Sequence, residues 1–189
     1  MIMENKEDIL TIIDIDLKKV AWFSLIITVL LSILGLVIYS WLHDGFNINF
    51  SIVDLLLFFL GYVLLIVFHE CFHLIGFWFF GKAPWSSMDY GVNLKLGIAY
   101  ATTNLPIVNS AMKKALLLPF WMTGVLPMLL GYWVDSPGLV LLGAWLVAGA
   151  AGDFAMYKEL IKYPAHLLIK DDPVEPKLYV LNNKKQDSI

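Results

Sequence analysis

The residues best suited to chemistry lie together in the segment LLIVFHECFHLIGFWFF, residues 64–80, which is otherwise almost entirely apolar. His69 and His73 are four positions apart, so on a helix both imidazoles lie on one face and can bind one metal ion. Glu70 lies beside this pair, where its carboxylate can polarise a metal-bound water instead of binding the metal. A charge in the middle of a membrane costs about 2.5–3.5 kcal/mol, so we expect these groups to be functional. The alternative is a chance match of two core histidines.

The pattern His-Glu-x-x-His on a helix is typical of zinc metalloproteases. Zinc lowers the pKa of a bound water to about 7, which makes a nucleophile at neutral pH. A catalytic zinc takes a third protein ligand and keeps a fourth position open. The longer pattern His-Glu-x-x-His-x-x-Gly-x-x-His does not supply that ligand, because Gly76 fits but Phe79 stands at the last position.

We predict that the third ligand is Asp153 in WLVAGAAGDFAMYKEL, the only acid clearly inside the last apolar segment. At 1.5 Å per residue, Asp153 lies about 23 Å from the outer end of its helix. His69 and His73 lie about 27 and 33 Å from the outer end of theirs, and a modest tilt closes the difference. Two alternatives stay open: Glu159 is the second candidate ligand, or Asp153 pairs with Lys158 or with water.

Small residues precede Asp153 at a spacing of four, a pattern that lets membrane helices approach closely. The stripe consists of Ala144, Ala148 and Gly152. Gly149, one turn before Asp153, is expected to clear space on the face that carries the ligand. The sequence therefore predicts a tightly packed helix that brings a carboxylate to the two histidines.

The composition indicates a polytopic membrane protein, because 59% of the 189 residues are hydrophobic and only 15% are charged. Apolar runs at about 20–42, 52–80, 114–134 and 138–160 approach or exceed the roughly 20 residues that cross a bilayer. We expect a cytoplasmic segment at 1–19, a transmembrane domain at 20–163 and a cytoplasmic tail at 164–189. The third run is interrupted by Pro119, Gly124, Pro127 and Gly131.

The lysines predict the orientation. All 13 basic residues are lysines, and they lie before the first run, between the second and third, and at or after the end of the fourth. The two remaining loops contain none, which predicts that both termini lie in the cytoplasm, with the protein spanning the cell membrane. The net charge of −3 gives no support for nucleic-acid binding, and Cys71 as the only cysteine excludes an intrachain disulfide.

The connection 81–113 is more than a simple loop. Apolar and small or polar residues alternate over 92–100, which predicts a half-buried strand or hairpin at the cytoplasmic face. An extended substrate could pair with this strand. KLYVL near the end of the chain predicts a short strand. The expected fold is an all-α membrane protein with four transmembrane helices and this small β element.

Several other polar residues carry weaker predictions. Cys71 is expected to point away from the metal, and His43 and His166 are expected at the membrane interfaces. Three asparagines could donate to an oxyanion but are better explained as turn or strand residues: Asn93, Asn104 and Asn109.

The His-Glu-x-x-His helix, the segment LLLPFW and the Asp in AGAAGDF resemble the bacterial membrane family called "putative zincin peptidase", which is similar in layout to the site-2 proteases. The resemblance covers roughly residues 50–165. It implies zinc at His69, His73 and Asp153, with Glu70 as general base. The chain differs from site-2 proteases because no Asn-Pro precedes Asp153, which stands in Gly-Asp-Phe instead of Leu-Asp-Gly.

The sequence therefore predicts a zinc metallopeptidase, with one zinc per chain, that cleaves membrane proteins or peptides near the cytoplasmic side of the bilayer. The first alternative is a membrane protein that binds or transports metal through the same ligands without catalysis. The second is a catalytically silent scaffold. The intact motif with Glu70 beside the two histidines favours the enzyme.

Overall fold

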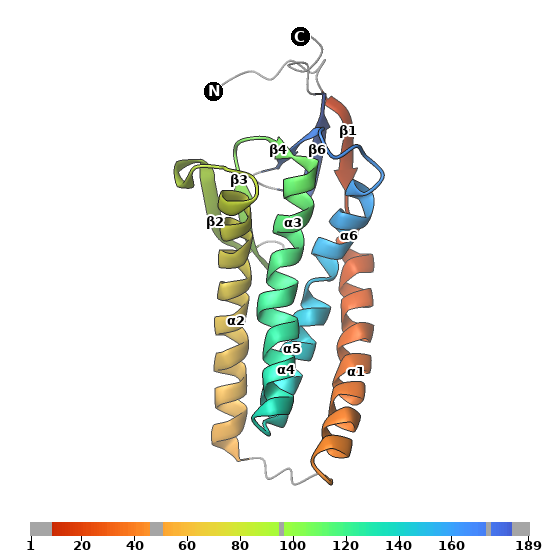
Figure 1. The fold of residues 1–189 in the computed structure, drawn as a ribbon, viewed down its shortest axis with the longest axis vertical. Helices are drawn as coiled ribbons and strands as arrows, with labels where there is room; N and C mark the ends of the chain where they lie inside the picture. The colour runs from red at the N-terminus through yellow and green to blue at the C-terminus, as the bar shows by residue number, and fades with distance from the viewer. Residues whose placement is uncertain (1–8, 46–50, 95–96, 173–174, 183–189) are drawn as a thin grey trace. The chain divides into compact units, whose positions relative to one another are not determined.

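We describe the protein from a computed structural model, which covers residues 9–45, 51–94, 97–172 and 175–182. Within these residues, four helical stretches are long and apolar enough to cross a membrane: Leu17–Leu42, Ile52–Phe79, Asn109–Trp133 and Pro137–Leu160. They confirm the four predicted runs. The chain is mostly helical, with small sheets (Figure 1). The residues group into two compact units.

The first unit combines Leu17–Phe72 with Leu118–Gly152, and the elements described in it are all helices. It contains α1 (Leu17–Leu42), most of α2 (Ile52–Phe79), α4 (Leu126–Trp133) and α5 (Pro137–Gly149). α1 packs along α5, where the Ser24 hydroxyl donates to the Ala148 carbonyl oxygen at 2.9 Å. Most apolar side chains of α1 and α2 are exposed, as expected of surfaces that face lipid.

Glycines bring α4 and α5 into close contact. A Cβ added at Gly131 would lie 2.6 Å from the Val140 nitrogen, and one added at Gly143 would lie 2.5 Å from the Met128 nitrogen. Only glycine fits where two backbones approach this closely. The small-residue stripe predicted at Ala144, Ala148 and Gly152 is wrong in its last position. An added Cβ at Gly152 meets no atom within 4 Å, so no neighbouring segment approaches closely there.

A polar cluster joins the end of α1 to the turn between α4 and α5. The Tyr39 hydroxyl donates to Asp135 at 2.5 Å, and His43 lies 3.2 Å from the same carboxylate oxygen. The second ring nitrogen of His43 lies 3.1 Å from the Tyr132 carbonyl oxygen. His43 thus helps to fix the packing of this helical unit.

The second unit combines the described residues of Met1–Asp16, His73–Leu117 and Asp153–Ile189. Its four-stranded antiparallel sheet has the order β1-β6-β5-β4. The strands are β1 (Ile9–Asp14), β4 (Ile107–Val108), β5 (Leu168–Asp171) and β6 (Lys177–Leu181). Strand β6 confirms the prediction for KLYVL. The sheet itself was not predicted, because β1 pairs with β6 from the far end of the chain (Figure 1).

The small β element predicted as a strand or hairpin is a hairpin, and its turn interrupts the alternating run expected over 92–100. Strand β2 (Met88–Asn93) pairs with β3 (Ile98–Thr103) after a short 3₁₀ turn η2 (Trp85–Ser87). Gly97 adopts φ +67° next to the start of β3, a left-handed conformation that glycine reaches at low cost. The alternation of apolar residues in the sequence continues through this turn and gives no sign of it. Lys95 and Leu96 of the predicted strand lie outside the described residues.

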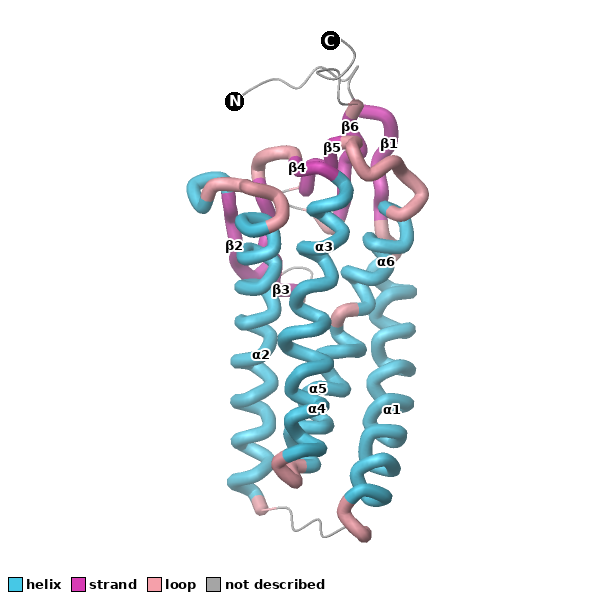
Figure 2. The backbone as a smooth tube through the Cα atoms, in the orientation of Figure 1, coloured by secondary structure: helices cyan, strands magenta, loops and turns pink. Residues whose placement is uncertain are grey.

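The third and fourth apolar runs are irregular helices. The third consists of α3 (Asn109–Pro119), a π-helical segment η3 (Phe120–Val125) and α4. The fourth breaks at Ala150 between α5 and α6 (Ala151–Leu160), where Figure 2 shows a short loop. The predicted interruption of the third run is confirmed. Single π-helical turns occur frequently at functional sites, and these two irregularities lie beside the predicted metal ligands.

Candidate metal centre

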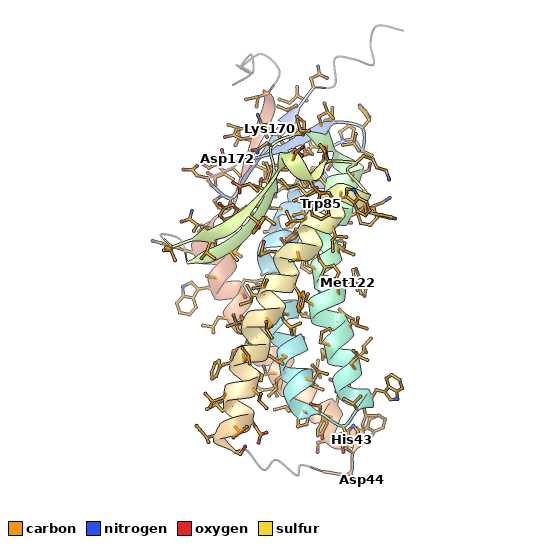
Figure 3. All side chains as sticks on the ribbon, turned by 90° about the vertical axis from the view of Figure 1, so that its left-hand side faces the viewer. His43, Asp44, Trp85, Met122, Lys170 and Asp172 are labelled. Atoms are coloured by element: carbon orange, nitrogen blue, oxygen red, sulfur yellow. The ribbon has the colours of Figure 1, made fainter. Side chains whose placement is uncertain are left out.

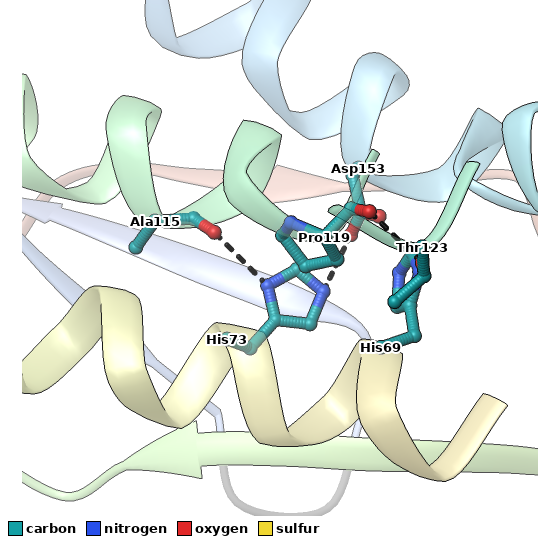
Figure 4. Close-up of polar contacts among 6 residues, drawn as sticks. All are labelled: His69, His73, Ala115, Pro119, Thr123 and Asp153. Atoms are coloured by element: carbon teal, nitrogen blue, oxygen red, sulfur yellow. Dashed lines mark hydrogen bonds and ion pairs between the residues drawn. The ribbon is translucent and has the colours of Figure 1, made fainter. Parts of the chain in front are cut away.

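The two histidines of the motif lie on α2 as predicted, one turn apart and both buried, with 8% and 6% of His69 and His73 exposed. Burial of an imidazole is expected to require a partner for each ring nitrogen. The partners of these nitrogens therefore show what each ring can bind (Figure 4).

The Nδ1–H of His73 donates to the carbonyl oxygen of Ala115 at 3.2 Å. A carbonyl only accepts hydrogen bonds, so Nδ1 carries the proton and Nε2 keeps its lone pair. This carbonyl is available because Pro119, four residues later in α3, has no N–H to bond it. Phe77 stacks on the His73 ring with 6.3 Å between the ring centroids, which also holds its orientation.

His69 is fixed in the same tautomer by a different element. The Thr123 hydroxyl donates its only proton to the Pro119 carbonyl oxygen at 2.9 Å. Its oxygen is then an acceptor for the Nδ1–H of His69, at 3.2 Å. The Nε2 atom of His69 therefore also keeps its lone pair. Thr123 is only 1% exposed and lies in the π-helical segment, whose backbone places the hydroxyl toward His69.

Asp153 lies in the first turn of α6 and approaches His73, with 3.3 Å between a carboxylate oxygen and Nε2. The start of a helix favours a negative charge. His69, His73 and Asp153 each offer one ligand atom, and these atoms lie within 4.8 Å of one another.

The group fits zinc by its chemistry. Imidazole nitrogen and carboxylate oxygen are ordinary zinc ligands, and three protein ligands are the usual number at a catalytic zinc. Both histidines are held by their Nδ1–H groups, which is how metal-binding imidazoles are normally oriented. The two rings are therefore prepared to offer Nε2 to a cation, and Asp153 supplies negative charge beside them.

The other residues considered in the sequence, Glu70, Cys71 and Glu159, are not part of this three-residue group. Glu70 follows His69 on α2 and is partly exposed, and Cys71 is exposed. Glu159, the second candidate ligand, pairs with Lys162 at 2.6 Å and is not in the metal group.

Asn109 is fully buried and has a structural role, because its side-chain amide donates to carbonyl oxygens around the end of α6, including Leu160 at 3.0 Å and Tyr163 at 2.9 Å. Its backbone N–H also donates to Leu167 at 2.8 Å. These bonds attach the start of α3 to the segment after α6, in keeping with the turn role expected for this asparagine.

Neither Thr123 nor the Ala115 carbonyl was predicted from the sequence, although both orient the histidines. Pro119 is expected to interrupt a helix, but a proline also leaves the carbonyl four residues earlier without its helical partner. The segment ALLLPFWMT therefore contained the signal: a free carbonyl at Ala115 and a hydroxyl one turn after the proline at Thr123.

One comparison with known proteins gives a match. The model of the family described as "Putative zincin peptidase" matches residues 62–168, more than half of the 189-residue chain. The matched range includes α2 from Tyr62 onward and extends past Asp153. No curated protein and no solved structure matches the chain.

Proposed function

Because the chain belongs to the family described as "Putative zincin peptidase", we propose that it is a zinc-dependent metalloprotease embedded in the membrane. It hydrolyses peptide bonds of membrane-associated substrates near the cytoplasmic side. The observation that carries this proposal is the buried group of His69, His73 and Asp153, in which both histidines offer Nε2. Glu70 beside this group provides the base that hydrolysis needs.

In this proposal three side chains, His69, His73 and Asp153, would hold the zinc. When bound, zinc supplies a Lewis acid for the scissile carbonyl and for the attacking water. Glu70 accepts the proton of that water and passes it to the leaving amine. Thr123 and the Ala115 carbonyl hold the two imidazoles in one tautomer throughout, so the ligands need no rearrangement during the reaction.

The membrane setting is part of the proposal. Four apolar helices and the lysine distribution support a plasma-membrane protein with both termini in the cytoplasm. A transmembrane substrate must unwind before its carbonyl can react, because a helix uses its own backbone groups.

The test is zinc content and peptide hydrolysis of the full chain in detergent. We expect about one zinc per chain in the wild type, and loss of zinc in His73→Ala and Asp153→Ala. Glu70→Gln should keep zinc and lose hydrolysis, whereas Cys71→Ala, an exposed neighbour on α2, should keep both. An active Glu70→Gln protein would contradict the mechanism, and a folded wild type that takes up no zinc would contradict the site.

The non-catalytic alternative predicts a different result. A metal transporter needs several sites along a path, but within the described residues only one group of three metal-binding side chains is found. Zinc binding without hydrolysis in the wild type, unchanged in Glu70→Gln, would favour that alternative.

A further inference from the structure

A hollow of about 320 Å³ lies where α2 ends and the chain turns toward the hairpin. It is lined by Trp78, Phe79, Lys82, Ala83 and Pro84. These residues belong to one continuous segment of the second unit, so a single turn of the chain forms the hollow. Its volume is at the lower end of the range for small-molecule sites, about 300–1,000 Å³, and suits one compact ligand group.

Aromatic rings form the apolar wall of this hollow. The Trp78 ring stacks on the ring of Trp85 in the 3₁₀ turn, with 6.1 Å between the ring centroids. Both tryptophans are exposed, and Trp85 is labelled in Figure 3. Tryptophan is enriched where a membrane meets water, because its ring is apolar and its N–H is polar. The wall therefore stands where a membrane-spanning α2 would reach the lipid headgroups.

Lys82 supplies the only charge among the residues that line the hollow. Its ammonium lies 5.4 Å from the centroid of the Phe79 ring, and within the described part of the chain it forms no ion pair. At the end of α2 the Phe77 carbonyl oxygen accepts from the backbone N–H of Ala83 at 3.1 Å, so this carbonyl does not need the lysine. The ammonium can therefore bind an anion from outside the chain.

The backbone of Lys82 supports a role for its side chain. Lys82 has φ +56°, in the left-handed region that is costly for any residue with a Cβ. A glycine would remove this cost, yet the neighbouring Gly81 serves another purpose, since a Cβ there would lie 2.7 Å from the Phe77 carbonyl oxygen. Residues held in such conformations cluster at ligand-binding sites. The strain at Lys82 thus favours a binding role for the ammonium.

The surroundings of Lys82 indicate the class of anion. A lysine ammonium binds phosphate as a point charge, and lysines beside a membrane attract anionic lipids. Ile75 and Phe79 lie one turn apart on α2 and are both exposed, so they continue the apolar wall along the helix. A lipid would place its phosphate at Lys82 and its acyl chains on this surface. A soluble phosphate would use the lysine alone and leave the rings exposed to water.

We propose that the hollow binds the phosphate-bearing headgroup of an anionic membrane lipid, with Lys82 on the phosphate and Trp78 and Phe79 against the acyl chains. The inference goes beyond the proposed protease and rests only on its membrane setting. In that setting the lysine distribution makes this the cytoplasmic end of α2, and the cytoplasmic leaflet carries anionic lipids. The bound lipid would hold the end of the helix that carries His69 and His73.

Native mass spectrometry of the full chain tests this site, because it counts the lipids that stay on the protein. The chain is released from nanodiscs that contain phosphatidylcholine and phosphatidylglycerol in equal amounts. We expect the wild type to retain phosphatidylglycerol over phosphatidylcholine by about fivefold, the preference that one lysine near an anionic surface supplies. Equal retention of the two lipids would overturn the site.

Variants locate the effect. Lys82→Gln should abolish the preference, and Lys82→Arg should keep it. Lys114→Gln is the matched control, because Lys114 also lies over a phenylalanine ring, 5.7 Å from the Phe80 centroid, but does not line the hollow. Thermal unfolding in the same detergent shows that each variant is folded. A preference that survives Lys82→Gln would overturn the site, as would an equal loss in Lys114→Gln, which would indicate a general surface charge.

Inorganic phosphate distinguishes a lipid from a soluble anion. Free phosphate should leave phosphatidylglycerol bound, because the acyl chains hold the headgroup in place. Displacement of the lipid by phosphate would overturn the lipid assignment. A chain that stays outside the nanodiscs would overturn the membrane setting, and this site with it.

The lipid site and the protease fail separately. Peptide hydrolysis by a chain that shows no lipid preference would leave the protease in place and remove the site. A preference for phosphatidylglycerol that requires Lys82, in a chain that hydrolyses no peptide, would leave the site in place and remove the protease.

Discussion

Gly76→Ala provides a sensitive test of how the metal centre is held. A Cβ at Gly76 would lie 2.7 Å from the Ala115 Cα and 2.8 Å from the Ala115 Cβ. Carbon atoms in contact are ordinarily about 3.5–4.0 Å apart, so α2 and α3 must separate by about 1 Å at this point. Ala115 also supplies the carbonyl oxygen that accepts from the Nδ1–H of His73 at 3.2 Å. After the separation, that distance is about 4 Å, which is too long for a hydrogen bond.

The consequence should appear in zinc affinity more than in folding. Loss of the group that orients a histidine ligand typically weakens metal binding about 10–100-fold, while overpacking costs about 1–3 kcal/mol of stability. Zinc affinity is measured by competition with a chromophoric chelator, and stability by thermal unfolding in the same detergent. Gly61→Ala is the matched control on α2, because its Cβ meets only the end of the Leu142 side chain, at 3.1 Å. An unchanged zinc affinity in folded Gly76→Ala would refute the reasoning.

Three further predictions concern neighbouring residues. Pro119→Ala restores an N–H that competes for the Ala115 carbonyl, so zinc affinity should fall by roughly fivefold, or about 1 kcal/mol; chelator competition checks this, and unchanged affinity would contradict it. Thr123→Val removes the acceptor for His69, so zinc affinity should fall about 10–100-fold with the helices intact by circular dichroism; a variant that binds zinc like the wild type would show that the tautomer needs no such partner. Asp171 is the third: its pKa is raised from 3.8 to about 7 in the folded chain. The folded state therefore binds more protons than the unfolded state between these values, and zinc-free protein should lose stability as pH rises from about 4 to about 7. Asp171→Asn should remove this pH dependence and gain at most about 4 kcal/mol of folding stability above pH 7, measured by thermal unfolding across pH. An equally pH-dependent variant would refute the assignment of this dependence to Asp171. Zinc in the wild type should reduce the effect, because its positive charge favours the carboxylate.

The sequence predicted the parts of this protein that depend on local pattern. The apolar runs gave the four long helices, and the spacing of His69 and His73 gave two imidazoles on one face of α2. Asp153 was an expected partner of the two histidines, because a carboxylate in an apolar helix is costly unless it is paired. The structure brings these three residues together. The role of Glu70 and the identity of the metal stay predictions, as do the domain limits at 1–19, 20–163 and 164–189.

The parts that were missed depend on contacts between distant segments. Nothing in the local pattern of residues 9–14 indicates pairing with residues 177–181, because strand partners are set by the whole fold. The turn at Gly97 was hidden because the alternation of apolar residues continued through it.

The position of β6 inside its sheet has a consequence for how the protein is made. β6 lies between β1 and β5, so β1 has no strand partner until residues 177–181 have left the ribosome. The unit that contains His73 and Asp153 is therefore completed late in synthesis, after all four apolar helices have been made. Nascent chains that stop before β6 should keep the ligand residues but lack the strand that joins β1 to β5. In this way the order of synthesis would delay completion of the unit that carries two of the three candidate metal ligands.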